Sequence, residues 1–329
     1  MFFMSKVSVI IPVYDVANYI EQCARSLFEQ TIDDIEYLFI DDCTPDNSIS
    51  ILYKVLDDYP QRKNQVVVHQ MESNSGQAAV RKWGILNATG DYIIHCDSDD
   101  WIDRDLCRLM YEKAIDEASD IVICDYLYVI NDNLQKRIKG CYGLRQEKLI
   151  EDLLNEKISW SVCNKLVKRQ LYQDTGILFP DDNMGEDMAI ILQLILRTNN
   201  ISYVPDAFYY YRSNPISISN FFSEAAVWNK YMQVRRNTEI VISAFKEYGL
   251  NNRFNLSFLK WNVRKTLWRI TYKNEYRRVW CNTYPEIFPS LFFSSLLSLQ
   301  DKFKIMLTYL RIYPQVPSSK KDLLNSGIF

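Results

Sequence analysis

Short apolar runs alternate with helix-period segments along the first 130 residues of this chain. Residues 7–12, 36–40, 66–69 and 92–96 are apolar runs of strand length, and 121–130 supplies one more strand or two. The segments that follow these runs, 20–28, 48–59, 77–88 and 106–119, carry apolar residues with helical spacing. Because a pair of parallel strands needs a crossover connection that is usually a helix, this order predicts an α/β fold. We expect a mostly parallel mixed sheet with helices on both faces and right-handed crossovers.

Acidic residues follow two of these predicted strands. Asp41 and Asp42 come directly after residues 36–40, whereas Asp97, Asp99 and Asp100 follow residues 92–96. In an open parallel sheet, ligands bind outside the carboxyl ends of the strands. Carboxylate oxygens suit Mg²⁺ or Mn²⁺, which join one or two carboxylates to substrate phosphates. The two acidic strand ends together predict one crevice for a divalent cation and a diphosphate, although either segment alone is compatible with a solvated acidic loop.

A third acidic element, Glu186 and Asp187, follows Gly185 and precedes an apolar segment, 189–196, that is typical of a buried helix. Carboxylates at a helix N-terminus are stabilised by free amides and by the helix dipole, so capping explains them structurally. The functional interpretation is a general base that takes a proton from a reacting hydroxyl. One residue can serve both roles.

Glycine-rich phosphate-binding motifs are absent from the sequence. Neither Gly-x-Gly-x-x-Gly nor Gly-Lys-Ser/Thr follows any of the predicted strands. A phosphatase with a nucleophilic Asp after the first strand matches poorly, because Pro12, Val13 and Tyr14 stand there. A nucleotidyltransferase also matches poorly, because residues 14–19 contain no glycine. We therefore expect a bound metal ion to hold the phosphates.

Several motifs in a fixed order resemble a known family. They are Pro12-Val13-Tyr14, Ile40-Asp41-Asp42, Asn74-Ser75-Gly76 with Arg81, Gly90-Asp91-Tyr92-Ile93, Asp97-Ser98-Asp99-Asp100 and Gly185-Glu186-Asp187. The set resembles the inverting nucleotide-sugar glycosyltransferases of family 2, and the resemblance runs from about residue 7 to residue 219. It implies a GT-A fold, a nucleoside-diphosphate-sugar donor that is commonly a UDP-sugar, a divalent metal, and inversion at the anomeric carbon. Residues 160–166, 209–212 and 217–219 also resemble bacterial members that build surface polysaccharides.

The resemblance also implies roles for individual residues. Asp41 resembles the residue that reads the nucleoside base, Asp99 the direct metal ligand with Asp97 beside it, and Asp187 the general base with Glu186 beside it. The other nucleotide-sugar positions that it implies are Pro12, Val13, Tyr14, Asp15, Asn74, Gly76, Arg81, Asp97 and Ser98. Departures occur at residues 43–46, where many relatives have Gly-Ser-Thr-Asp, at Asp15, where Asn is frequent, and at Lys82, where Asn is frequent. These departures leave the sugar and the nucleotide open.

Two cations and a tyrosine run remain open to two interpretations each. Lys165 and Arg212 are residue types that bind phosphate, so either one could meet the diphosphate or the acceptor, but Lys165 is equally compatible with a surface position. The run 209–211, three tyrosines, could stack a sugar ring or could form an edge strand with aromatic packing.

Charge divides the chain into an acidic body and a basic tail. Residues 1–219 contain 21 Lys and Arg against 34 Asp and Glu, whereas residues 220–329 contain 17 against 7. We predict a catalytic domain over residues 1–219 and a basic, mainly helical extension over residues 220–329. The apolar stripe within 255–272 indicates a helix that packs on its neighbour or, alternatively, lies on anionic lipid. Residues 290–313 are too short and too interrupted to span a membrane, and peripheral contact of the extension with a membrane would suit a lipid-linked acceptor.

Other features of the sequence limit the cellular compartment and the binding partners of the protein. The eight cysteines form no Cys-x-x-Cys pair, and no signal-peptide core precedes Pro12, so we expect reduced thiols and a cytoplasmic protein, either free or associated with the inner face of the membrane. A pI near 5.6 argues against nucleic acid. The acceptor is expected to be a saccharide or lipid-linked saccharide. The alternative function is a non-catalytic nucleotide-sugar-binding or scaffold protein, which would bind donor without turnover.

Overall fold

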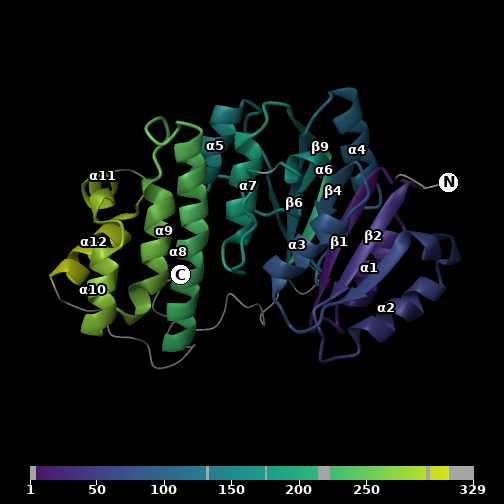
Figure 1. Ribbon diagram of the computed structural model, residues 1–329, viewed down its shortest axis with the longest axis horizontal. Coiled ribbons are helices and arrows are strands. Elements are labelled where there is room, and N and C mark those ends of the chain that lie inside the picture. The colour runs from purple at the N-terminus through teal and green to yellow at the C-terminus, as the bar shows by residue number, and fades with distance from the viewer. Residues whose placement is uncertain (1–4, 131–132, 175, 214–222, 294–296, 311–329) are drawn as a thin grey trace.

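The first part of the chain alternates strands and helices as predicted. The computed structural model describes residues 5–130, 133–174, 176–213, 223–293 and 297–310 (Figure 1). Its first elements are β1 (Val7–Val13), α1 (Ile20–Phe28), β2 (Ile35–Asp41), α2 (Ser48–Asp57), β3 (Val66–Gln70), α3 (Gln77–Asn87), β4 (Tyr92–His95), β5 (Trp101–Ile102) and α4 (Leu106–Asp116), with a 3-10 turn η1 (Pro60–Gln65) before β3. The two-residue strand β5 lies in a segment that carries no strand pattern in the sequence.

The second part of the chain adds further strands between helices. They are β6 (Ile121–Ile130), β7 (Asn133–Ile138), α5 (Gln146–Leu154), β8 (Lys165–Lys168), α6 (Arg169–Tyr172), α7 (Glu186–Leu196) and β9 (Ile201–Arg212). Residues 121–130 therefore form one strand and not two. Helix α7 is buried along nearly all of its length, as its apolar sequence predicts.

Among the described residues, the strands form a nine-stranded sheet in the order β3-β2-β1-β4-β8-β6-β9-β5, with β7 paired to β6. Strands β1, β2, β3, β4, β6 and β9 run in one direction, and β5, β7 and β8 run in the opposite direction. The α/β class and the mixed, mostly parallel sheet are confirmed. The antiparallel strand β8 lies between β4 and β6, which brings residues 159–165 to the end of β4.

The register of the sheet explains why the acidic segments meet. Val13 at the end of β1 pairs with Asp41 at the end of β2, and the amide of Cys96 after β4 donates to the carbonyl of Ile10 in β1 at 3.0 Å. Strand β1 lies inside the sheet, and its valine and isoleucine side chains are fully buried. The ends of β2 and β4 therefore open on the two sides of β1, at the same edge of the sheet.

The C-terminal region is mainly helical, as expected, and lies at the other end of the molecule from α1 and α2 (Figure 1). It comprises α8 (Glu224–Glu247), α9 (Ser257–Leu267), α10 (Asn274–Asn282), α11 (Phe288–Phe293) and α12 (Leu299–Tyr309), with 3-10 turns η3 (Trp268–Ile270) and η4 (Pro285–Ile287). The long helix α8 packs against α7 on one side and α9 on the other. The predicted boundary at residue 219 and the segment 217–219 lie outside the described residues.

The apolar stripe of α9 is buried. Leu259, Val263 and Leu267 are at most 1% exposed, and Trp261 and Trp268 join a second apolar cluster with Trp280. Packing is therefore the correct interpretation of this stripe, and an α9 that lies on lipid is wrong. Within the described residues, no helix combines the length and the apolar character needed to cross a bilayer.

Candidate active site

The loops after β1 and β2 are joined by hydrogen bonds. The carboxylate of Asp46 accepts from the amides of Ala17 at 2.8 Å and Ser48 at 3.0 Å. Asp41 is buried, and its Oδ1 accepts from the amide of Thr44 at 2.7 Å. The predicted nucleoside pocket therefore has a fixed frame at the ends of these strands.

Two residues in these loops adopt left-handed backbone conformations. Asp15 has φ 54° and Cys43 has φ 56°. Aspartate tolerates this region, whereas a cysteine there carries strain that glycine would not. The Cys43 thiol donates to the carbonyl of Met71 at 3.1 Å. Residue 43 thus has a backbone conformation that glycine adopts readily, although the sequence of the loop at 43–46 departs from the family pattern.

The remaining nucleotide-sugar positions lie around the same edge. Ser98 Oγ donates to the Pro12 carbonyl at 2.6 Å, which links the end of β4 to the end of β1. Asp42 accepts from the amides of Ser75 at 2.7 Å and Gly76 at 2.8 Å. Gly76 has φ 84°, and a Cβ there would meet the side chain of Asn183. Of the other predicted positions, Val13 is buried, while Tyr14 and Asn74 are exposed.

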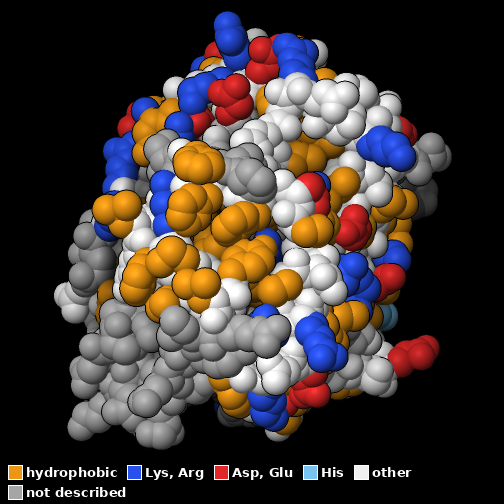
Figure 2. All heavy atoms as spheres, turned by 90° about the vertical axis from the view of Figure 1, so that its left-hand side faces the viewer, with side chains coloured by type: hydrophobic (Ala, Val, Ile, Leu, Met, Phe, Trp, Pro, Cys, Tyr) orange, Lys and Arg blue, Asp and Glu red, His pale blue; other side chains and the backbone are white. Residues whose placement is uncertain are grey.

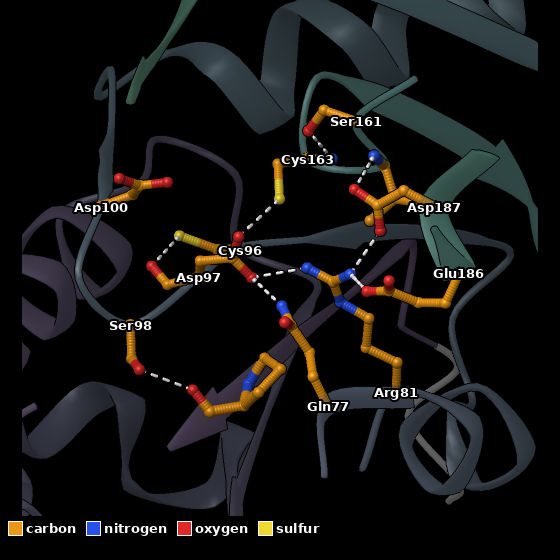
Figure 3. A network of polar contacts seen from close by, with 12 residues as sticks. Gln77, Arg81, Cys96, Asp97, Ser98, Asp100, Ser161, Cys163, Glu186 and Asp187 are labelled. Atoms are coloured by element: carbon orange, nitrogen blue, oxygen red, sulfur yellow. Dashed lines mark hydrogen bonds and ion pairs between the residues drawn. The ribbon is translucent and has the colours of Figure 1, made fainter. Parts of the chain in front are cut away.

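Arg81 joins the acidic segments. The residue is 5% exposed, and Nη2 donates to Asp97 Oδ1 at 2.7 Å, while Nη1 donates to Glu186 Oε1 at 2.5 Å and to Asp187. Figure 3 shows Arg81 between Asp97 on one side and Glu186 with Asp187 on the other. Burial opposes the charge of Arg81, but the three carboxyl groups raise its pKa well above the ordinary value. Sequence reasoning missed this arrangement, because it placed Arg81 on the donor.

The two acids at the start of α7 differ in environment. Burial, together with the neighbouring Asp187, raises the pKa of Glu186 well above its ordinary value, although Arg81 opposes the shift. The side chain of Glu186 is 11% exposed, whereas that of Asp187 is 27% exposed. Both lie in the first turn of α7 after Gly185, which has φ 86°. Asp187 is thus the more open carboxyl group of the two.

Residues of β9 hold the loop that contains Asp99. Asp100 is buried and accepts from Tyr209 Oη at 2.6 Å and from the Arg212 amide at 2.7 Å. Arg212 Nε donates to the Asp99 carbonyl at 3.0 Å, and the guanidinium lies 4.7 Å from the ring centre of Trp101. Within the tyrosine run, Tyr209 is therefore a buried support for this loop. Arg212 stabilises the same loop through its hydrogen bonds to Asp99 and Asp100.

The other tyrosines of the run and Lys165 also have defined surroundings. Tyr210 stacks on Trp101 with ring centres 5.1 Å apart, and Tyr211 stacks on Tyr128 at 5.9 Å. Aromatic packing within the sheet therefore accounts for both rings. Lys165 is 1% exposed, so the interpretation of it as a surface lysine is wrong.

The acidic motif can be tested for its fit to a metal ion. Among the described residues, no group of three or more His, Cys, Asp or Glu side chains is arranged to hold one. Asp97 Oδ1 accepts from Arg81 and from Gln77 Nε2 at 3.2 Å, and Oδ2 accepts from the Cys163 thiol at 3.5 Å. A Mg²⁺ or Mn²⁺ ion that joins one carboxylate to a diphosphate needs no protein cage. Asp99 and Asp97 offer carboxylate oxygens of the type that such an ion takes, and both oxygens of Asp97 already accept hydrogen bonds from protein groups.

Known proteins share this sequence and fold. Residues 8–183 match the family model described as Glycosyl transferase family 2. "Uncharacterized glycosyltransferase EpsJ" of Bacillus subtilis (strain 168) is 29% identical over 252 residues, which are 74% of this chain and 71% of that protein. The crystal structure of S. aureus TarS 1-349 in complex with UDP-GlcNAc superposes with a TM-score of 0.67 at 19% identity, over 93% of this chain and 88% of that one.

A second solved structure shares the fold. The mannosyltransferase PcManGT from Pyrobaculum calidifontis, in complex with GDP-Man and Mn²⁺, has a TM-score of 0.53 at 16% identity and covers 93% of this chain and 84% of that one. These structures confirm the GT-A fold. The family model covers more than half of the 329 residues. The chain therefore belongs to glycosyl transferase family 2.

Proposed function

We propose that this glycosyltransferase moves a sugar from a UDP-sugar to an acceptor hydroxyl with inversion, aided by a divalent cation, in the synthesis of a bacterial polysaccharide. The observation that carries the proposal is the arginine that joins Asp97 at the end of β4 to Asp187 at the start of α7. One guanidinium spans only a few ångströms, so the two carboxyl groups flank one small site. A donor held near Asp97 would present its anomeric carbon close to Asp187.

The donor pocket is proposed at the ends of β1, β2 and β4. Asp41 would accept a hydrogen bond from a ring N–H of the base, and Pro12, Val13, Tyr14 and Asp15 would line the same pocket. The hydrogen bonds of Ser98 to Pro12 and of Asp42 to the loop at 75–76 support a preformed wall. The similarity of the fold to a protein solved with UDP-GlcNAc supports a uridine nucleotide.

Asp187 is proposed as the general base. It would take the proton of the acceptor hydroxyl as that oxygen bonds to the anomeric carbon, and the bond to the diphosphate would break on the opposite face, so that its electron pair leaves with the diphosphate. The greater exposure of Asp187 supports this choice. Glu186 keeps its proton more readily, because burial and Asp187 raise its pKa. Its proposed part is to hold Arg81 and α7 in place.

A divalent cation, Mg²⁺ or Mn²⁺, would be held by Asp99, with Asp97 nearer the ribose or a bound water. When bound, such an ion neutralises negative charge on a departing diphosphate, which is worth several kcal/mol. Arg81 holds Asp97 in a fixed orientation beside Asp99. A mannosyltransferase of similar fold, solved with GDP-Man and Mn²⁺, supports the use of a divalent ion, but does not choose between the two metals.

Asp187→Asn tests the proposed base. The substitution keeps the shape of the side chain and removes the proton acceptor, so transfer should fall at least a hundredfold, about 2.7 kcal/mol, while the Kd for UDP changes less than threefold. The matched control is Asp181→Asn, because Asp181 also lies near the start of α7 but has a side chain that is 93% exposed. This control should change neither the rate of transfer nor the Kd for UDP. Equal loss of donor binding and transfer in Asp187→Asn would show that this residue is structural.

The C-terminal region is proposed to contact the cytoplasmic face of the membrane through the surface of α11 and α12, and not through α9. Figure 2 shows hydrophobic side chains gathered on the face at the α10 to α12 end of the molecule. Five exposed apolar residues lie on α11, on α12 and directly after α12, and we call them the α11–α12 patch: Phe293, Leu299, Phe303, Met306 and Leu310. Phe293 and Leu299 are each 85% exposed. The excess of basic residues over residues 220–329 suits anionic lipid. Such contact would bring the site to a lipid-linked acceptor.

Vesicle sedimentation tests this contact. Wild-type protein should sediment with phosphatidylglycerol vesicles and much less with phosphatidylcholine vesicles, and the double change Leu299→Glu and Phe303→Glu should release it. Tyr53→Glu, at a 51% exposed tyrosine of α2, is the matched control and should have no effect. The proposed surface would be contradicted if the double variant sedimented as much as Tyr53→Glu, or if wild-type protein did not sediment with either kind of vesicle.

A further inference from the structure

One short loop touches both of the acids that Arg81 joins. Residues 159–164, which we call the bridging loop, lie between α5 and β8. The amide of Val162 donates to Asp187 Oδ2 at 3.4 Å, a long hydrogen bond, and the Cys163 thiol donates to Asp97 Oδ2 at 3.5 Å (Figure 3). Arg81 therefore holds these carboxyl groups from one side, and the bridging loop holds them from another.

The bridging loop is wrapped around the ammonium group of Lys165. This group donates to the carbonyl oxygens of Ser159 at 3.1 Å and Ser161 at 2.7 Å, and to Asn164 Oδ1 at 2.8 Å. An ammonium group has three donors, so all three are used within the loop. The loop is further closed by the Ser161 hydroxyl, which accepts from the Cys163 amide at 3.1 Å. Lys165 thus fixes the backbone that presents Val162 and Cys163 to the acids.

The burial of Lys165 needs a reason other than stability. The side chain is 1% exposed, and the three groups to which its ammonium group donates are neutral oxygens. A buried ammonium group without a directly bonded carboxylate is costly, and an apolar side chain of similar length would avoid that cost. Burial lowers the pKa of Lys165 to about 8, while the nearby charge of Asp187 acts in the opposite direction. The charge is therefore placed where it acts on Asp187.

We propose that Lys165 is a positioning residue for sugar transfer: it holds the bridging loop against Asp187 and Asp97 and places a second buried positive charge behind Asp187. This inference rests on the proposed function, since it assigns Lys165 to the base of that reaction. In this role Lys165 would contact neither donor nor acceptor, because its three ammonium donors are used within the bridging loop. Its effect on the reaction passes through the bridging loop and through Asp187.

The test compares Lys165→Met with Lys168→Met in the full-length chain. Lys168 is on the same strand β8, but its side chain is 41% exposed and pairs with Asp120 at 3.1 Å. Lys165→Met should lower kcat for transfer at least tenfold, with the KM and the Kd for UDP-sugar changed less than threefold. Lys168→Met should leave kcat within twofold of wild type. An unchanged kcat in Lys165→Met would overturn the proposal.

A double-mutant cycle separates positioning from general damage to the fold. Residues that act through one group lose their effect when that group is removed. In the Asp187→Asn background, Lys165→Met should therefore lower the residual kcat by less than twofold. A full tenfold loss in that background would mean that Lys165 acts independently of Asp187, which would overturn the proposal.

A milder variant covers the case in which Lys165→Met does not fold. Ser161→Ala removes one hydrogen bond within the bridging loop and leaves every charge in place, so it should fold and should lower kcat about threefold in the wild-type background only. A wild-type chain that shows neither transfer nor donor hydrolysis would refute the proposed function itself. An active wild type in which Ser161→Ala and Lys165→Met both retain full kcat would refute only the role of Lys165.

Discussion

Replacement of Arg81 by methionine removes the one group that three carboxyl groups share. Arg81 is buried and donates to Asp97, Glu186 and Asp187. Methionine is close to the aliphatic part of the arginine in shape, so the change removes charge and hydrogen bonds more than it removes packing. We expect Arg81→Met to destabilise the fold and to disorder the site on which transfer depends.

The size of the loss follows from the burial of the partners. Removal of one partner of a buried ion pair costs about 3–5 kcal/mol, because an uncompensated charge remains. The side chains of Asp97 and Asp187 are 24% and 27% exposed, so water can partly solvate them, and Glu186 can retain its proton. We therefore expect a loss near the lower end of that range, about 3 kcal/mol of unfolding free energy.

Urea denaturation followed by tryptophan fluorescence measures this loss directly, as a shift of the midpoint at a constant m-value. The matched control is Arg108→Met, because Arg108 forms ion pairs with Asp105 and Glu112 on the surface of α4. Surface pairs contribute about 0–1 kcal/mol, so this control should change stability little. Arg81→Met with a loss under about 1 kcal/mol would refute the view that Arg81 holds the acids together.

Other predictions concern the metal, the donor loop and pH. Asp99→Ala should abolish the metal dependence of UDP binding in calorimetry, and an unchanged metal-dependent Kd would contradict its role as ligand. Gly76→Ala should cost about 1–3 kcal/mol in urea denaturation, because φ is 84° and the Cβ would meet Asn183; unaltered stability would contradict this. Lys165 has a pKa of about 8 when folded against 10.5 ordinarily, so the unfolded chain binds more protons above pH 8. The contribution of Lys165 to the unfolding free energy should therefore rise by roughly 2 kcal/mol from pH 8 to 9.5, measured as the difference between wild type and Lys165→Met. The comparison is needed because burial raises the pKa of the Cys107 and Cys124 thiols, which lowers the stability of both proteins over the same range.

The sequence was sufficient to predict the parallel half of the fold, because its elements are local. The apolar runs and amphipathic segments up to residue 116 each carry their own period, and the predicted helix 77–88 corresponds to α3, Gln77–Asn87. The antiparallel strands β5 and β8 are short, with two and four residues, and are defined by pairing with distant strands. Strands of this kind carry no periodic pattern of apolar residues from which they could be predicted.

The site was predicted in part for a similar reason. Acidic residues at strand ends indicate a common edge, and the register of β1 with β2 and β4 confirms that these ends are adjacent. The partners of Arg81 and the burial of Lys165 depend on segments far apart in the chain, and no spacing within the sequence encodes those contacts. For the stripe of α9, the sequence allowed packing or lipid contact, and only the position of α8 and the C-terminal helices decides for packing.

Calorimetric titration of the purified chain with UDP, in Mn²⁺ and again in EDTA, tests the central claim most directly, with GDP as the control nucleotide. The account predicts that UDP binds in Mn²⁺, that EDTA weakens this binding at least tenfold, and that GDP binds at least tenfold more weakly than UDP. No binding of UDP, or equal binding of UDP with and without the metal, would contradict a metal-dependent UDP-sugar transferase.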